Sequence, residues 1–185
     1  MPEPAGAGLI SVVGGESTGK TALAAALGAR LPAVVVSEFL RSWVESNHGR
    51  VPLPGEQPEV MAAHRDSEIA AMLEAEQEGL PWVVSDSGPL MTAVYSIQYY
   101  GDDSLLPTAL QWAARSDRLV WCQDDFPWQP DAQRDGADAR SRSQQILAAI
   151  FDEHPELPML AVHGPLDTRV EAVLNTVGRP DVPPA

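Results

Sequence analysis

The stretch Gly14-Gly15-Glu16-Ser17-Thr18-Gly19-Lys20-Thr21 decides how this chain folds. It fits the pattern G-x-x-x-x-G-K-[S/T], in which a glycine-rich turn wraps around phosphate groups. The β-branched run Leu9–Val13 before it predicts a buried strand, and the alanine- and leucine-rich run Thr21–Arg30 after it predicts a helix. A strand, a glycine-rich turn and a helix in this order form the setting that a phosphate-binding loop requires.

Each part of this stretch has a physical task. The glycines allow backbone conformations that point several N–H groups at one anion, and the helix that starts near Lys20 adds the positive end of its dipole. Lys20 is expected to reach the β- and γ-phosphates, and the Thr21 hydroxyl to bind Mg²⁺. We therefore expect ATP and Mg²⁺ as cofactors, bound by all eight residues of the stretch: Gly14, Gly15, Glu16, Ser17, Thr18, Gly19, Lys20 and Thr21.

The rest of the chain alternates short β-branched runs with helical stretches, which predicts a single-domain α/β P-loop fold with a five-stranded parallel sheet and helices on both faces. The further expected strands are Ala33–Ser37, Trp82–Asp86, Arg118–Cys122 and Met159–Val162. The further expected helices are Glu38–Asn47, Gln57–Glu78, Leu90–Tyr100, Leu105–Arg115, Arg140–Glu153 and Asp167–Val177. In the long helix, one apolar stripe is expected from Met61, Ile69, Met72 and Leu73.

The chain has 185 residues, which is enough for one domain with a full core. We expect that domain at residues 9–177, between a flexible N-terminus at residues 1–8 and a flexible tail at residues 178–185. The net charge of −14 argues against nucleic-acid binding, because a strongly acidic surface repels a polyanion. The single cysteine fits a reducing cytosol, where we expect the protein. Residues 1–8 lack the basic start and the apolar core of a signal peptide, and the most apolar stretch, Thr21–Val36, is too short to span a membrane.

Two carboxylates fall at the carboxyl ends of expected strands, where open α/β sheets bind their ligands. Asp86 ends the third strand and is a candidate to hold Mg²⁺ or a water bound to it, although it could instead cap the following helix. Glu38 follows the second strand and is a candidate acceptor for the proton of a substrate hydroxyl, although it could merely favour the dipole of its helix. Arg41 could bind substrate phosphate or only pair with Glu45.

An irregular stretch with several arginines follows the fourth expected strand and is a candidate lid over the site. Within it, Arg134 could offset the charge that develops on the transferring phosphoryl group, and Arg140 could bind the nucleotide. The alternative is a solvated loop whose arginines balance the charges of neighbouring aspartates.

Three patches of the sequence together resemble the ribosylnicotinamide kinase domain of the NadR proteins and its free-standing relatives. They are the loop Gly14–Thr21, the run Ser37-Glu38-Phe39-Leu40-Arg41, and the segment Pro127-Trp128-Gln129-Pro130-Asp131-Ala132-Gln133-Arg134, which is similar to the family's P-W-x-x-D-G-x-R. Two positions depart from the family's pattern: Gly88 stands where the family has an acid or amide, and Ala132 where it has a glycine. The H-x-G-H signature of the adenylyltransferase domain is absent.

This resemblance implies an ATP-dependent kinase of a small nucleoside, which would convert nicotinamide riboside into nicotinamide mononucleotide. Glu38, Arg41, Trp128 and Asp131 would then bind the substrate. The face of Trp128 would attract the cationic ring, and the Asp131 carboxylate would bind the ribose hydroxyls. As alternatives, Trp128 could pack under the lid and Asp131 could pair with Arg134.

Two other functions stay open on the same scaffold: a kinase of another nucleoside or small metabolite, and a regulatory ATP-binding switch without a small acceptor. The sequence lacks the [N/T]-K-x-D motif of a GTPase and the L-S-G-G-Q-like signature of a transporter ATPase. It is also too short for the second helical domain of an AAA-type motor.

Overall fold

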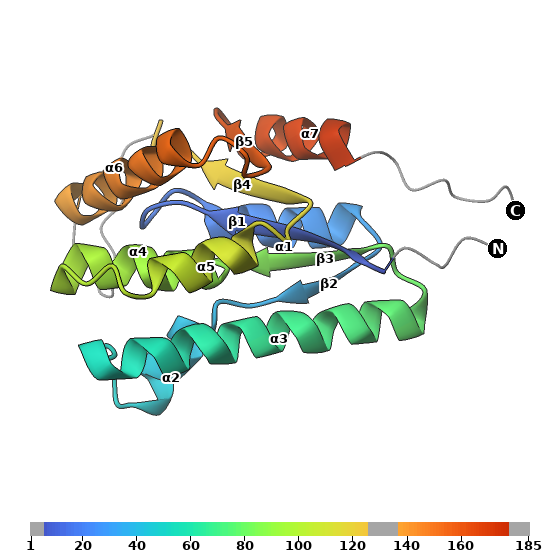
Figure 1. The fold of residues 1–185 in the computed structure, drawn as a ribbon. Helices are drawn as coiled ribbons and strands as arrows, with labels where there is room; N and C mark the ends of the chain where they lie inside the picture. The colour runs from blue at the N-terminus through green and yellow to red at the C-terminus, as the bar shows by residue number, and fades with distance from the viewer. Residues whose placement is uncertain (1–5, 126–136, 178–185) are drawn as a thin grey trace, which may run out of the picture.

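A computed structural model of the chain describes residues 6–125 and 137–177. Five strands form one parallel sheet in the order β2-β3-β1-β4-β5 (Figure 1). They are β1 (Gly8–Val13), β2 (Ala33–Val36), β3 (Trp82–Asp86), β4 (Arg118–Cys122) and β5 (Met159–Val162). The predicted fold class is confirmed, because β1 lies in the middle of a parallel sheet and the chain winds outward from it in both directions.

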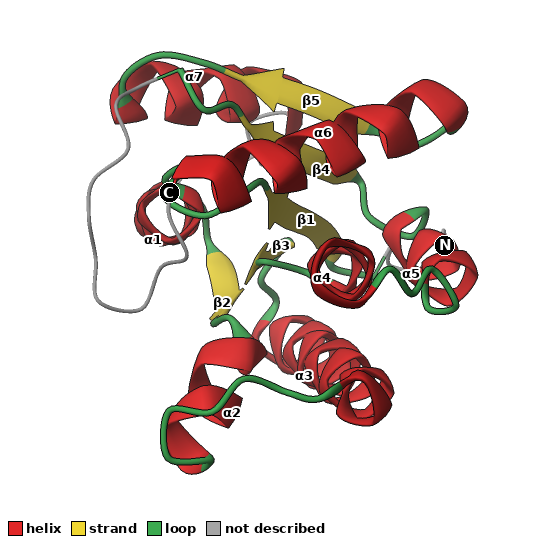
Figure 2. Cartoon of the chain, turned by 90° about the vertical axis from the view of Figure 1, so that its left-hand side faces the viewer, coloured by secondary structure: helices red, strands yellow, loops and turns green. Residues whose placement is uncertain are grey.

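Helices cover both faces of this sheet, as Figure 2 shows along the strands. The helices α1 (Lys20–Arg30) and α7 (Leu166–Val177) lie on one face. The other face is covered by α3 (Gln57–Glu78), α4 (Pro89–Tyr100), α5 (Leu106–Ala113) and α6 (Ala137–Glu153). The short helix α2 (Phe39–Ser46) and the 3₁₀ turn η1 (Pro54–Glu56) lie in the connection between β2 and α3.

The core follows from the alternation of side chains along each strand. Ile10 and Val12 of β1 point to the α1 and α7 face, where they pack with Leu23 and Leu27. Val13 points to the opposite face and joins the cluster built from α4, α5 and α6. Because both faces are covered, the strands read as continuous apolar runs, which is why most of their boundaries could be predicted from the sequence.

The long helix α3 begins and ends where the sequence predicts, at Gln57 and Glu78, but its expected apolar stripe is wrong in part. Ile69 and Leu73 are exposed, at 38% and 54% of their surface. The side chains that α3 buries are Gln57, Val60, Met61, His64, Glu68, Ala71 and Ala75. The buried stripe therefore has two titratable side chains in its middle, and a search for apolar residues alone follows the wrong side of the helix.

Among the described helices, none combines the length and the apolar composition that crossing a membrane requires. Residues 1–5 and 178–185 lie outside the described part of the chain, so the flexible ends stay a prediction.

Candidate functional site

The phosphate loop, Gly14–Thr21, lies at the carboxyl end of the central strand and leads into α1. Three of its residues have positive φ angles: Gly14 with φ of 152°, Ser17 with φ of 56°, and Gly19 with φ of 84° directly before α1. A side chain at Gly15 would put its Cβ only 2.7 Å from the backbone oxygen of Arg140. The loop thus needs glycine at this position because the start of α6 is packed directly against it.

The peptide groups of Gly15 are the centre of the loop's hydrogen bonds. The Gly15 N–H donates to Oε1 of Gln144 on α6 over 3.0 Å. The Gly15 carbonyl accepts bonds from the Thr18 hydroxyl at 2.8 Å and from the Lys20 ammonium at 2.9 Å. Lys20, the single lysine of the chain, is therefore held across its own loop with its charged end at the site.

Gln144 is itself fixed on both sides of its amide. Its nitrogen donates to the Cys122 carbonyl at the end of β4, and its oxygen also accepts from the Trp121 indole. The side chain is buried at the base of the loop. We infer that Gln144 sets where α6 sits relative to the phosphate loop, a role that no pattern in the sequence indicated.

Arg169 on α7 holds the other side of the loop, and no pattern in the sequence indicated this role. Its guanidinium donates to the Thr18 carbonyl at 2.7 Å, to the Gln123 carbonyl at 3.0 Å and, through Nε, to the Gly164 carbonyl at 2.8 Å. It also pairs with the Asp125 carboxylate. The side chain is almost fully buried, so its charge joins the ends of β4 and β5 to the loop.

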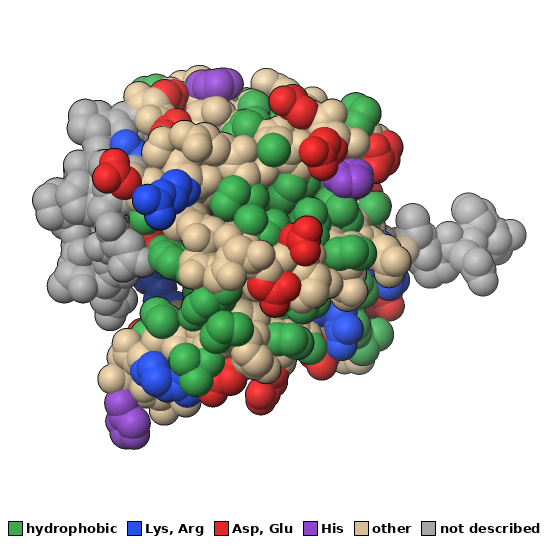
Figure 3. All heavy atoms as spheres, turned by 60° about the vertical axis from the view of Figure 1, so that its left-hand side comes forward, with side chains coloured by type: hydrophobic (Ala, Val, Ile, Leu, Met, Phe, Trp, Pro, Cys, Tyr) green, Lys and Arg blue, Asp and Glu red, His purple; other side chains and the backbone are tan. Residues whose placement is uncertain are grey.

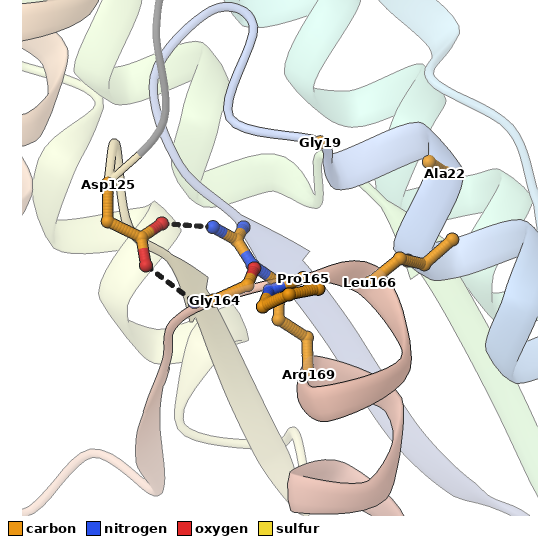
Figure 4. A pocket seen from close by; sticks show the side chains of 7 residues that line it. All are labelled: Gly19, Ala22, Asp125, Gly164, Pro165, Leu166 and Arg169. Carbon is orange, nitrogen blue, oxygen red and sulfur yellow. Dashed lines mark hydrogen bonds and ion pairs between the residues drawn. The ribbon is translucent and has the colours of Figure 1, made fainter.

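A pocket of about 480 Å³ opens beside this clamp (Figure 4). Ala22, Pro165 and Leu166 contribute apolar surface, and the remaining lining residues are Gly19, Asp125, Gly164 and Arg169. Figure 4 shows the Asp125 carboxylate turned to Arg169 and to the N–H of Gly164. Gly19 of the phosphate loop also lines the pocket. A ligand whose phosphates are bound by the loop could therefore place its remaining part in the pocket.

Asp86 lies next to the strand that enters the loop. Strand β3 pairs with β1 so that Asp86 faces Val12, and the following N–H, of Ser87, donates to the Val12 carbonyl. The Asp86 carboxylate is buried, and the Ser87 hydroxyl donates to it over 3.5 Å. Thr21 is exposed on the first turn of α1.

These two side chains fit a magnesium ion. A hydroxyl and a carboxylate are the oxygen ligands that Mg²⁺ prefers, and Mg²⁺ usually takes the rest of its shell from phosphates and water. Among the described residues, no group of three or more His, Cys, Asp or Glu side chains could form a cage for a metal made by the protein alone. The assignment of Thr21 and Asp86 to Mg²⁺ remains a prediction.

The opposite side of the site carries Glu38, directly before α2. Its carboxylate is largely buried and lies 3.7 Å from the Arg41 guanidinium. The structure thus pairs Arg41 with Glu38, and not with Glu45, the pairing that the sequence offered as the alternative to phosphate binding. The view of Figure 3 shows a hollow between the lobe with α2 and the body of the molecule, with a basic side chain inside it.

The charges of several carboxylates act on the buried phenol of Tyr95 on α4, another residue that the sequence did not single out. Burial raises the pKa of Tyr95 well above its ordinary value, and the charges of Glu38, Glu16 and Asp86 raise it further. Three of the predicted site residues therefore lie within electrostatic reach of one phenol. Near it, the Tyr99 hydroxyl donates to Glu16 over 3.4 Å.

Arg134, Trp128 and Asp131 lie outside the described residues, and their predicted roles stay predictions. Arg140 is buried against Gly15 at the start of α6, which brings it to the phosphate loop as nucleotide binding would require.

Comparisons with known proteins agree with the fold described above. The AAA domain family matches residues 9–169, the part of the chain that carries the sheet and the loop. No curated protein matches the sequence. The family match concerns the nucleotide-binding unit, so the expectation that the chain is not an AAA-type motor stays a prediction.

Several solved structures share the fold. A crystal structure of NadR protein in complex with NR is 19% identical with a TM-score of 0.74, and one of NadR in complex with NAD and AMP-PNP is 18% identical with the same score. Each covers 94% of this chain, which spans about half the length of the NadR chains (52% and 50%). Thymidylate kinase from Ehrlichia chaffeensis is 14% identical with a TM-score of 0.69, and the superposition covers 94% of this chain and 99% of the kinase. The predicted resemblance to NadR is thus confirmed at the level of the fold.

Proposed function

Because this chain belongs to the AAA domain family and has the fold of nucleoside and nucleotide kinases, we propose that it is an ATP-dependent kinase of a small nucleoside, with nicotinamide riboside as the acceptor. The observation that carries the proposal is the meeting of three groups at one edge of the sheet. The phosphate loop with Lys20 follows β1, Asp86 is the last residue of the neighbouring β3, and Glu38 follows β2. A phosphate donor and a hydroxyl acceptor need these functions side by side.

The pocket beside Arg169 supports a nucleotide as the donor. Its apolar walls, Ala22, Pro165 and Leu166, suit a flat base, and its 480 Å³ lies in the usual range for small-ligand pockets. The loop N–H groups and the start of α1 would bind the phosphates, since helix N-termini attract anions. ATP would therefore extend from the pocket across Gly19 to Lys20.

The charges on the other side support a nucleoside acceptor over a nucleoside monophosphate. The charges of Glu16, Glu38 and Asp86 all act on Tyr95, and Arg41 is already paired with Glu38. Clustered carboxylates repel a phosphate monoester, whereas they tolerate a neutral acceptor and attract a cationic one. Nicotinamide riboside has a cationic ring, which also fits the net charge of −14.

The chemistry would consist of positioning and charge neutralisation. Glu38 would accept the proton of the acceptor's 5′-hydroxyl while that oxygen forms a bond to the γ-phosphorus. The bond from this phosphorus to the oxygen bridging the β- and γ-phosphates would break, and ADP would leave. Lys20 would stabilise charge on the β- and γ-oxygens. Magnesium, held by Thr21 and Asp86, would supply further neutralisation of the phosphates.

The choice of nicotinamide riboside itself rests on the resemblance carried by residues 127–134. Trp128 would stack on the cationic ring, and Asp131 would bind the ribose hydroxyls. Arg134 would reach the transferring phosphoryl group.

An acceptor panel tests the proposal. ATP consumption is measured with nicotinamide riboside, uridine, thymidine and thymidine monophosphate at equal concentration. We expect nicotinamide riboside to stimulate ATP use most and thymidine monophosphate least. Preference for another nucleoside would keep the kinase and discard the acceptor. No stimulation by any acceptor would favour a regulatory ATP-binding switch.

Two variants separate the acids. Glu38→Gln should lower kcat about 10²- to 10⁴-fold, because it removes a proton acceptor, and should leave the KM for ATP unchanged. Asp86→Asn should instead raise the Mg²⁺ concentration that half-saturates the reaction. A Mg²⁺ titration of both variants measures these effects, and wild-type turnover by Glu38→Gln would remove Glu38 from the mechanism.

A further inference from the structure

A buried polar cluster lies on the inner side of α3, and the proposed chemistry does not use it. His64 is 3% exposed and Glu68 is completely buried. Burying such groups costs free energy unless they form hydrogen bonds, so the partners of each one show what the cluster holds in place. Among the described residues, no other histidine is buried.

His64 makes two hydrogen bonds, one from each ring nitrogen. The backbone N–H of Phe39 donates to Nδ1 over 3.2 Å, and Nε2 lies 2.9 Å from the Ser85 hydroxyl oxygen. A backbone N–H can only donate, so Nδ1 must be the acceptor. The neutral ring therefore carries its proton on Nε2 and donates it to Ser85.

These two partners belong to the two elements that carry the candidate acids. Phe39 is the first residue of α2, directly after Glu38. Ser85 is the residue directly before Asp86 in β3. One imidazole thus connects the start of α2 to the end of β3.

The start of α2 has particular need of such a bond. The first N–H groups of a helix have no partner within it, and no side chain from α2 or its N-cap residue caps this end. The helix has only eight residues and buries none of them. A helix that short is marginal by itself, so its position depends on outside contacts.

We infer that His64 is a positioning residue: it caps α2 from α3 and so fixes Glu38 relative to Asp86 and the phosphate loop. The catalytic consequence rests on the role proposed for Glu38, whereas the capping does not. Protonation of Nδ1 would point a hydrogen at the Phe39 N–H and break the cap. Burial lowers the pKa of His64 to about 4, so the ring is neutral at neutral pH. The Glu68 carboxyl group, 3.7 Å from Nε2, is the other titratable group that faces it.

Two substitutions divide the function of the ring between its nitrogens. In His64→Asn, the amide oxygen takes the place of Nδ1 and can still accept from Phe39, but the bond to Ser85 is lost. In His64→Gln, the amide reaches Ser85, but the cap on α2 is lost. Each variant loses one hydrogen bond, so each is the control for the other. His154→Gln, at a partly exposed histidine beside Glu156, is the control for a change far from α2.

Amide hydrogen exchange, read by NMR, tests the cap without any substrate. We expect the Phe39 amide to exchange slowly in the wild type and in His64→Asn and rapidly in His64→Gln. The ¹⁵N shifts of the wild-type ring should show the proton on Nε2. A ring protonated on Nδ1, or equal protection of Phe39 in both variants, would overturn the inference, and the wild-type measurement requires no variant to fold.

Kinetics then test the positioning. We expect His64→Gln to lower kcat about 10- to 100-fold with the KM for ATP unchanged, because small misplacements of a reacting group cost about this much. His64→Asn should retain more than a third of the wild-type kcat. Equal losses in both variants would mean that His64 acts through stability alone. If no acceptor supports turnover, the proposed function fails, and the exchange data still decide whether His64 caps α2.

Discussion

The two sides of the site are held in different ways. The phosphate loop is fixed by buried side chains from α6 and α7, since Gln144 binds Gly15 and Arg169 binds the Thr18 carbonyl. The acceptor-side segment, residues 37–57, contains a helix without a buried residue, and His64 ties its start. The phosphates of the donor are the same for every acceptor, so a rigid loop suits them. In the proposed function the acceptor side would carry the selectivity, and its helix α2 has no buried residue.

This difference has a consequence for dynamics. Regions with few buried contacts open locally at low free energy, while the core opens only with global unfolding. We therefore expect slow exchange for loop amides near Gly15 and faster exchange along α2 beyond the capped N–H of Phe39.

The largest expected effect is on the loop side, at Arg169. In Arg169→Gln, Asp125 and three carbonyls lose their buried partner, so the free energy of unfolding should fall by about 3–5 kcal/mol. Arg30→Gln is the matched control. Arg30 pairs with Glu171 of α7, the helix that carries Arg169, but the Arg30 side chain is 55% exposed. This substitution should cost at most about 1 kcal/mol. Urea unfolding measures both, and equal losses would contradict the clamp.

Next is Lys20. Lys20→Ala should leave the fold intact and reduce ATP turnover about 10²- to 10³-fold, as expected on removing one donor that stabilises transition-state charge. Circular dichroism and ATP turnover are measured on the same sample. Normal turnover by a folded variant would show that the loop does not act on phosphate.

A smaller effect, on the pH dependence of the free energy of unfolding, is expected from the pair His64 and Glu68, which lies between the two sides. Burial lowers the pKa of His64 from 6.5 to about 4 and raises that of Glu68 from 4.5 to about 7. His64 therefore adds stability above pH 6.5 that is lost as the pH falls toward 4. Glu68 adds stability below pH 4.5 that is lost as the pH rises toward 7. Between pH 4.5 and 6.5 the folded and unfolded chains bind the same number of protons at this pair, and the two slopes cancel.

Single variants should uncover each slope. Glu68→Gln should become more stable as the pH rises through this window, and His64→Asn less stable, each by about 1.4 kcal/mol per pH unit. Urea unfolding at several pH values provides the measurement. If the stability of both variants changed with pH in the same direction, folding would not shift the pKa values of His64 and Glu68 in opposite directions.

The smallest effect is expected on the acceptor side, at Arg50. Its guanidinium bonds Glu56 and lies 4.8 Å from the centre of the Trp43 ring, all on the surface. Arg50→Gln should leave the melting temperature unchanged within error, because exposed ion pairs contribute little. It should change the KM for the acceptor less than about threefold. A large drop in melting temperature would mean that the acceptor-side segment is as firmly held as the loop.

The sequence predicts the fold well and the site in part. Strands β3, β4 and β5 have the expected boundaries, because buried parallel strands stand out as β-branched runs. The phosphate loop was found because its function dictates a local pattern. Arg169 and His64 were missed as contributors to the site because they bind backbone groups far away in the chain, and such partners leave no pattern in the sequence. The stripe through Ile69 and Leu73 was wrong because the buried side of α3 is partly polar.

Lys20 has one more consequence, for chemical labelling. It is the chain's single lysine, it is buried, and its amine lies against the Gly15 carbonyl. Amine-directed acylating reagents thus have one side-chain target in the whole protein, apart from the terminal amine. Phosphates bound by the loop would cover this amine, so protection of Lys20 from acylation would report occupancy of the phosphate loop, and the mass of the peptide that contains Lys20 would distinguish it from labelling of the terminal amine.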